Sequence, residues 1–175
     1  MVEDMIERQR ILKARAVVLA REPEVSEADE ERIEIVEFLL ADERYAIESA
    51  YIGEVYALAD LTPLPCTPAF VLGIINMRGR ILPVIDLRRF FDLPVSGLSD
   101  LSKVLLLQDD TMEFGILADA IIDARWISRS AIHPSLPTLT EIRAEYLMGV
   151  TEERLVLLDG GKLLSASGIV VHEEV

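Results

Sequence analysis

The chain has 175 residues, of which 51% are hydrophobic and 27% are charged, and its formal net charge at pH 7 is −14. This composition excludes a disordered chain, and the length is typical of one ordinary domain or two small ones. The chain has no apolar run of the roughly 18 residues that span a membrane and no secretory signal, so we expect a cytoplasmic protein. The acidic balance disfavours nucleic acid as a partner, because phosphates are bound by clustered Lys and Arg, and it is compatible with a protein partner.

The N-terminal segment, residues 2–20, has the composition of a helix, because it is rich in Glu, Arg, Leu, Ile and Ala and lacks Gly and Pro until Pro23. Such a helix could pack on the domain or dock a partner, and the sequence leaves both open. Residues 22–31 are acidic and contain no aromatic residue, which is typical of a solvated linker. We therefore assign residues 1–32 to a helix and linker and expect the folded domain to begin near Ile33.

Strand patterns dominate after this point. Residues 35–40 and 45–47 are mostly apolar and flank Ala41-Asp42-Glu43-Arg44, which predicts a β-hairpin. Residues 104–107 and 114–117 flank a short polar turn in the same way. We therefore predict two hairpins of related design.

The segment from Phe70 to Phe91 is the most distinctive part of the chain. Its two apolar arms are rich in β-branched residues and meet at Asn76-Met77-Arg78-Gly79, so we expect two strands that reverse direction there. Gly79 can take the positive φ of a tight turn, and the turn then displays Arg78. After the second arm, Asp86 can cap a short helix.

The C-terminal part repeats this design. Residues 70–74 and 146–150 share the order aromatic, apolar, apolar, Gly, branched. A polar turn follows each, and then an apolar strand that ends at Asp86 in one copy and at Asp159 in the other. This duplication predicts two small all-β units, each closed as a barrel.

The boundary between the two units should fall near residues 94–100, where Pro, Ser, Gly and Asp cluster. The first barrel would then cover about residues 33–93 and the second about residues 101–168. Residues 169–175 would form a C-terminal tail.

The residue types that catalysis requires are sparse. The chain has neither a phosphate-binding loop nor a nucleophile elbow, so we predict no enzymatic activity and no cofactor. Cys66, the only cysteine, has no histidine nearby in sequence, and an unreactive thiol is expected. His133 and His172 each lack a second histidine at metal-ligand spacing, and Asp109 and Asp110 are better explained as turn formers than as metal ligands.

Trp126 follows the apolar pair Ile121-Ile122. We expect its side chain to fill the core of the second unit or the seam beside it. A partner contact is the alternative, because tryptophan is enriched in binding hot spots.

The hairpin resembles the signature of the CheW family, adaptor domains that couple bacterial and archaeal chemoreceptors to the histidine kinase CheA. The resemblance lies in GIINMRG at residues 73–79 and ILPVIDLR at residues 81–88, where Met77 replaces the leucine that is commonest in the family. It implies an all-β fold of two intertwined five-stranded SH3-like barrels over about residues 33–168, with a groove between them. The N-terminal helix would be an extension of this fold.

The resemblance also implies the function of a non-enzymatic chemotaxis adaptor. Its partners would be the cytoplasmic signalling tip of a chemoreceptor and the regulatory domain of a CheA-type kinase. The protein would reach membrane-anchored receptor arrays through these partners, with no direct membrane insertion. In the family, the receptor tip docks against a hydrophobic groove at the junction of the barrels; residues for the kinase contact do not transfer from a motif, and we assign none.

Ile52 and Glu54, which follow the first hairpin, match an apolar residue and an acid of the family that are implicated in receptor coupling, and Arg78 matches the arginine of the family's signature turn. With Asn76 and Gly79 they make up the predicted partner-binding site. An apolar groove would supply affinity, and a charged rim would set the register of a bound helix. Core packing is the alternative for Ile52, and pairing with a neighbouring acid is the alternative for Arg78.

Two other hypotheses stay open. A coupling protein of a related chemosensory pathway, such as pilus-based motility, would have the same fold. A small-molecule sensor or enzyme would use the groove as a pocket, which requires converging polar groups in an apolar cleft, and the sequence offers no obvious set.

Overall fold

The computed structural model describes residues 31–95, 102–134, 144–166 and 169 of the chain. The helix expected at residues 2–20, most of the acidic linker, residues 96–100 of the expected boundary and His172 lie outside the described residues. The chain divides into two compact units, residues 1–32 and residues 33–175, and the predicted site residues belong to the second. None of the helices in the described ranges has the length and apolar character that a membrane crossing requires.

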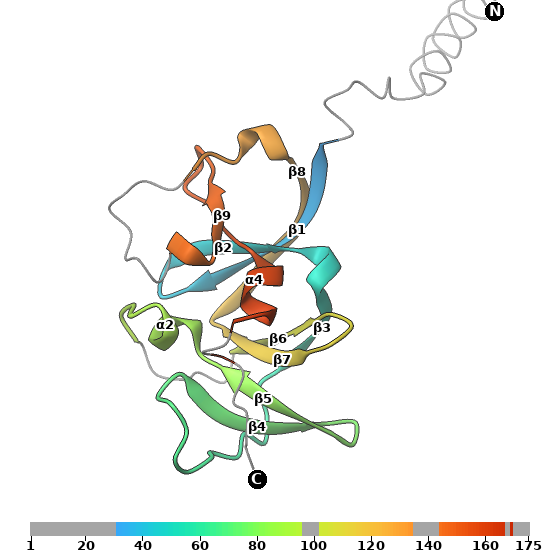
Figure 1. Ribbon diagram of the computed structural model, residues 1–175, viewed down its shortest axis with the longest axis vertical. Coiled ribbons are helices and arrows are strands. Elements are labelled where there is room, and N and C mark those ends of the chain that lie inside the picture. The colour runs from blue at the N-terminus through green and yellow to red at the C-terminus, as the bar shows by residue number, and fades with distance from the viewer. Residues whose placement is uncertain (1–30, 96–101, 135–143, 167–168, 170–175) are drawn as a thin grey trace, which may run out of the picture. The chain divides into compact units, whose positions relative to one another are not determined.

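Within the described residues, ten strands form two five-stranded sheets (Figure 1). Sheet A has the strand order β8-β1-β2-β10-β9, and sheet B has the order β3-β6-β7-β5-β4. The strands are β1 (Arg32–Leu40), β2 (Glu43–Glu48), β3 (Ile52–Ala57), β4 (Val71–Met77), β5 (Arg80–Ile85), β6 (Lys103–Gln108), β7 (Glu113–Ala118), β8 (Ala120–Ser128), β9 (Leu147–Val150) and β10 (Val156–Leu158). The short helices are η1 (Ser49–Tyr51), α2 (Leu87–Phe90), η2 (Arg129–Ala131) and α4 (Gly160–Leu164).

The three hairpins expected from the sequence are present as the antiparallel pairs β1–β2, β4–β5 and β6–β7. The sheets nevertheless mix strands from both sides of the expected boundary. Strand β10 pairs parallel to β2, and β5 pairs parallel to β7, so each later strand joins the hairpin of the other half. The expected units, residues 33–93 and 101–168, are therefore not the two sheets, and the halves of the chain are intertwined.

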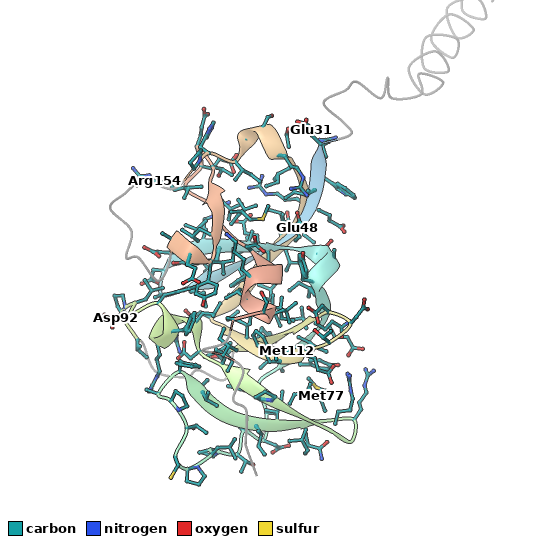
Figure 2. All side chains as sticks on the ribbon, in the orientation of Figure 1. Glu31, Glu48, Met77, Asp92, Met112 and Arg154 are labelled. Atoms are coloured by element: carbon teal, nitrogen blue, oxygen red, sulfur yellow. The ribbon has the colours of Figure 1, made fainter. Side chains whose placement is uncertain are left out.

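Both sheets bury side chains on two faces. The largest apolar cluster contains residues of both sheets, among them Phe38 and Tyr45 of sheet A and Leu105 and Phe114 of sheet B. Figure 2 shows side chains filling the space between the sheets. Each sheet also has a smaller apolar cluster of its own, which includes Ile35 in sheet A and Val104 in sheet B.

The repeated motif has a structural cause. A Cβ on Gly73 would lie 2.2 Å from the carbonyl oxygen of Thr62, and a Cβ on Gly149 would lie 2.3 Å from that of His133. Each carbonyl belongs to an isolated bridge, Thr62–Ile74 in one sheet and His133–Val150 in the other. Both glycines thus allow a segment that follows one end strand of a sheet to approach the strand at the opposite end.

The aspartates that end the two repeats also have equivalent roles. The Asp86 carboxylate accepts a hydrogen bond from the Arg88 amide at 3.0 Å and caps α2, which confirms the predicted cap. The Asp159 carboxylate accepts one from the Lys162 amide at 3.0 Å and caps α4. The duplication therefore extends from the bridge glycines to the helix caps.

The expected burial of Trp126 is wrong, because the side chain is 59% exposed. Trp126 lies in β8, an end strand of sheet A, and the neighbouring Ile127 is the residue that packs in the core of that sheet. Apolar residues occur on both faces of β8, and only the face that carries Ile127 is buried.

Candidate partner-binding site

The turn between β4 and β5 displays Arg78. Met77 and Arg80 pair across the turn, and the two residues between them have positive φ, +50° at Arg78 and +84° at Gly79. This is the geometry of a type I′ turn. The Gly79 amide donates a hydrogen bond to Oδ1 of Asn76 at 3.0 Å. The predicted turn is therefore confirmed, and Asn76 and Gly79 shape it.

Arginine is an unusual residue for this position. The left-handed conformation costs a residue with a Cβ about 1–2 kcal/mol, and Asn, Asp and Gly are the residues that normally occupy it. The Arg78 side chain is 78% exposed, so packing does not compensate for that cost. Backbone strain of this kind concentrates at functional positions.

Glu54 of β3 lies next to Arg78. Its Oε1 is 3.4 Å from Nη1 of Arg78, and its other carboxylate oxygen accepts a hydrogen bond from the hydroxyl of Tyr56. With the side chains 78% and 42% exposed, this ion pair contributes about 0–1 kcal/mol to stability. Strands β3 and β4 are the opposite ends of sheet B, so the pair joins Glu54 in β3 to the turn that follows β4. Both charges remain accessible to solvent.

Ile52 is the first residue of β3 and lies at the margin of the main core. It pairs with Leu107, and the register then shifts so that Val55 pairs with Leu105. The shift places Ile52 and Val55 on one face of the strand, since their partners are two residues apart. Ile52 is partly buried against the core, whereas Val55 is 44% exposed. The structure thus places an apolar margin and Glu54, which pairs with Arg78, on the same strand.

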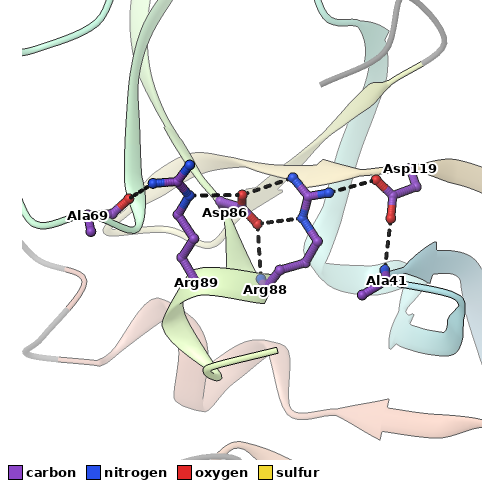
Figure 3. A network of polar contacts seen from close by, with 6 residues as sticks. All are labelled: Ala41, Ala69, Asp86, Arg88, Arg89 and Asp119. Carbon is purple, nitrogen blue, oxygen red and sulfur yellow. Dashed lines mark hydrogen bonds and ion pairs between the residues drawn. The ribbon is translucent and has the colours of Figure 1, made fainter. Parts of the chain in front are cut away.

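Sequence patterns missed a buried charge network between the two sheets (Figure 3). Arg88 is 1% exposed and donates from Nε and Nη2 to the two carboxylate oxygens of Asp86, at 2.9 Å each. Its Nη1 donates to Asp119 at 3.1 Å, and Asp119 accepts a second bond from the Ala41 amide at 2.8 Å. The hydrogen bond with Asp86 raises the pKa of Arg88 above its usual value, although burial opposes the charge.

This network connects the end of the β4–β5 hairpin with the β1–β2 turn, because Asp86 follows β5 and Ala41 follows β1. Arg89 lies at its margin, where Nε is 3.7 Å from Asp86 and Nη1 donates to the Ala69 carbonyl at 3.5 Å. The signal in the sequence was the run Asp86-Leu87-Arg88-Arg89. It identified the cap, but not which arginine is buried.

Two surface cavities bear on the small-molecule hypothesis. One, of about 350 Å³, has polar walls in which Arg125 and Glu153 are already paired at 2.9 Å. The other, of about 390 Å³, borders the main apolar cluster, to which Val71, Ile85, Phe114 and Ile169 belong. Its lining is mostly apolar and consists of Leu64, Thr67, Val71, Ile74, Pro83, Ile85, Met112, Glu113, Phe114 and Ile169. Neither cavity combines an apolar cleft with several unpaired polar groups.

Asp109, the first residue of the acidic pair at the β6–β7 turn, behaves as a turn former. Oδ1 of Asp109 accepts hydrogen bonds from the amide and hydroxyl of Thr111 and from the amide of Met112, at 2.7, 2.9 and 2.8 Å. These bonds lower the pKa of Asp109, with the Thr111 amide as the largest cause. Among the described residues, no group of three or more His, Cys, Asp or Glu is arranged to hold a metal ion.

Comparisons with known proteins agree with the fold. A family model described as the CheW-like domain matches residues 34–168. Chemotaxis protein CheW of Treponema pallidum (strain Nichols) is 32% identical over 145 residues, which cover 79% of this chain and 85% of that protein. Protein FrzA of Myxococcus xanthus is 32% identical over 135 residues, covering 74% and 84%.

A solved structure gives the same result. The crystal structure of the scaffolding protein TtCheW from Thermoanaerobacter tengcongensis matches with a TM-score of 0.65 and 31% identity, covering 72% of this chain and 88% of that one. The chain therefore belongs to the CheW-like family of chemotaxis scaffold proteins.

Proposed function

We propose that this protein is a non-enzymatic adaptor that couples chemoreceptors to a CheA-type histidine kinase. Membership of a family of chemotaxis scaffold proteins supports the proposal. The mechanism is adjacency: an adaptor that holds both partners raises the effective concentration of one near the other without new chemistry. The protein would act in the cytoplasm, at receptor arrays that it reaches through its partners.

The observation that carries the proposal is the exposed Glu54–Arg78 pair on the strand that also carries the apolar margin of Ile52 and Val55. A receptor signalling tip is helical, and an amphipathic helix binds an apolar surface through its own apolar side chains. Charges at the rim of such a surface set the register and exclude wrong partners. An arginine held at a strained turn position loses less conformational freedom on binding than one on a loose loop.

The proposal includes two structural features, the closure of each sheet into a barrel and a helix in the N-terminal extension. The bridges Thr62–Ile74 and His133–Val150 support closure of each sheet into an SH3-like barrel, because each joins a segment beyond one end strand to the other end strand. The extension at residues 2–20 is proposed to be helical on its composition alone.

Binding to each partner tests the function directly. A receptor signalling tip and a kinase regulatory domain are titrated separately into the labelled full chain, and both are expected to bind. Binding to neither partner would end the proposal. A ternary mixture should also form one complex, because the two contacts must coexist for coupling.

Substitution of Arg78 tests the site. Arg78→Asn removes the charge but suits the left-handed turn, so the free energy of unfolding should stay the same or rise by up to about 1 kcal/mol. Binding of one partner should weaken at least about fivefold, and binding of the other should not change. Arg80→Asn is the matched control, since Arg80 lies in the same hairpin and pairs with Glu113 at 2.7 Å. Equal binding by Arg78→Asn and the wild type would remove Arg78 from the site.

A second candidate is coupling in a related chemosensory pathway, such as pilus-based motility. The identity of 32% to FrzA, equal to that with the Treponema protein, supports it. Receptor tips and kinase domains encoded near this gene can be compared with those of other pathways in the same binding assay. The partner set that binds more tightly identifies the pathway.

A further inference from the structure

Strand β8 is an exposed edge with an apolar stripe. It ends sheet A next to β1. The bridge His133–Val150 that reaches the opposite end strand lies beyond the end of β8, and in the part of the chain that the structure describes no strand pairs with the other side of β8 itself (Figure 1). Ile122 is 45% exposed, Trp126 is 59% exposed, and Ala124 between them is also exposed. These alternate residues share one face of the strand. A long edge strand with exposed apolar residues is a template for pairing with another strand.

The sequence of β8 is complementary to itself. When two copies pair antiparallel with Ala124 opposite Ala124, Asp123 of each copy lies opposite Arg125 of the other, and Ile122 lies opposite Trp126. Opposite charges and aromatic–branched pairs are the favourable cross-strand combinations, and the small residue falls at the centre.

Neighbouring registers lack this match. Centring the pair on Asp123 places two carboxylates opposite each other, and centring it on Arg125 does the same with two guanidinium groups. A shift by one residue sets Ile122 against Arg125, an apolar side chain against a charge. Like charges in direct opposition are destabilising, so the Ala124 register is favoured over its neighbours.

The charged residues of β8 are placed to take part. The Arg125 side chain is held by Glu37, whose Oε2 is 3.2 Å from Nε, and by Glu153, whose Oε2 is 2.9 Å from Nη2. It remains 33% exposed, so a further carboxylate can reach it. Asp123 is exposed, and one of its oxygens accepts a hydrogen bond from the Ala124 amide at 2.8 Å. An arriving Asp123 would extend an existing row of alternating charges.

We propose that two copies of this protein associate through β8, antiparallel about a two-fold axis at Ala124. The two A sheets then form one continuous sheet, and the interface is isologous, as in most homodimers. This inference goes beyond the proposed coupling function. It uses none of the residues of the candidate partner-binding site, so a dimer presents two such sites.

Trp126 supplies a direct readout because it is the only tryptophan of the chain. Raising the protein concentration should shift its fluorescence to shorter wavelength, in parallel with dimer formation in sedimentation velocity. Ala124→Lys places two ammonium groups at the axis and should abolish both changes. Because Ala124 is exposed, thermal unfolding of dilute Ala124→Lys should match that of the wild type.

Disulfide trapping tests the register. Cys66 is exposed and is first replaced by Ser. Ala124→Cys should then form a disulfide dimer, because opposite residues of paired strands have Cα atoms about 4.5–5.5 Å apart, within reach of the bond. Ile122→Cys is the matched control: in the proposed register the two copies of this residue are offset by about 13 Å, and it should form no more dimer than random collision gives.

Equal trapping of Ala124→Cys and Ile122→Cys would overturn the proposal, as would a chain that stays monomeric at all concentrations with unchanged Trp126 fluorescence. A shift in fluorescence only on addition of a kinase regulatory domain would also overturn it, and would assign β8 to that partner instead.

Discussion

Removal of the Arg88 guanidinium should be among the most costly polar substitutions in this domain. Arg88→Met keeps most of the apolar stem but leaves the carboxylate of Asp86, which is 1% exposed, without its two charged donors. Breaking a buried ion pair in this way costs about 3–5 kcal/mol, a large part of the roughly 5–15 kcal/mol that stabilises a domain. The loss at Asp119 should add little, because that side chain is 28% exposed and keeps its bond from the Ala41 amide.

The buried charge, not the lost contact, is the main cause of this cost. The double variant Asp86→Asn/Arg88→Met removes that charge and retains an Asn that can cap α2. It should therefore be more stable than Arg88→Met alone by about 1–3 kcal/mol.

Equilibrium unfolding in urea measures these differences, and Arg89→Met is the control. Arg89 is 45% exposed and 3.7 Å from Asp86, so its replacement should change the free energy of unfolding by less than about 1 kcal/mol. If Arg88→Met cost no more than Arg89→Met, or if the double variant were no more stable than the single one, the argument from an uncompensated buried charge would be wrong.

Two further predictions concern the bridge glycine and the acidic turn. Gly149→Ala should lower the free energy of unfolding by about 1–3 kcal/mol, because the added Cβ would lie 2.3 Å from the His133 carbonyl oxygen. Gly79→Ala should cost less in the same thermal unfolding assay, because no atom lies within 4 Å of a Cβ added there. Because the pKa of Asp109 is lowered, this carboxylate stabilises the folded state at pH values above the pKa that Asp109 has in the unfolded chain. The contribution is lost as the pH falls through the pKa of Asp109 in the folded state. Asp109→Asn should therefore flatten the acid limb of unfolding free energy against pH; an unchanged limb would contradict the assignment.

The features that the sequence predicted well are local. The turn at Arg78 and Gly79 and the cap at Asp86 each depend on residues within a few positions of one another. The repeated glycine motif was visible for the same reason. Its cause, the approach of a distant carbonyl, was visible only in the structure.

The features that the sequence could not supply are contacts between distant segments. Nothing in the pattern of β10 states that it pairs with β2 and not with a strand of its own half. Apolar residues at Trp126 and Ile127 predict burial on both faces of β8, but which face is covered depends on the position of the strand in the sheet. The grouping of Glu54 and Arg78 in one predicted site likewise came from the family resemblance, and the ion pair between them was visible only in the structure.

The pairing of β2 with β10 sets an order for folding during synthesis. The strands of sheet B are contiguous, from Ile52 to Ala118, whereas sheet A needs the hairpin β1–β2 and the last strands of the chain. The first hairpin to leave the ribosome must therefore wait for Val156–Leu158, and pairing over so long a separation is slow to form. Although the chain is built as a duplication, neither half encloses a complete sheet, so a fragment that ends near Pro94 should not fold and the domain should gain its stability in one late step.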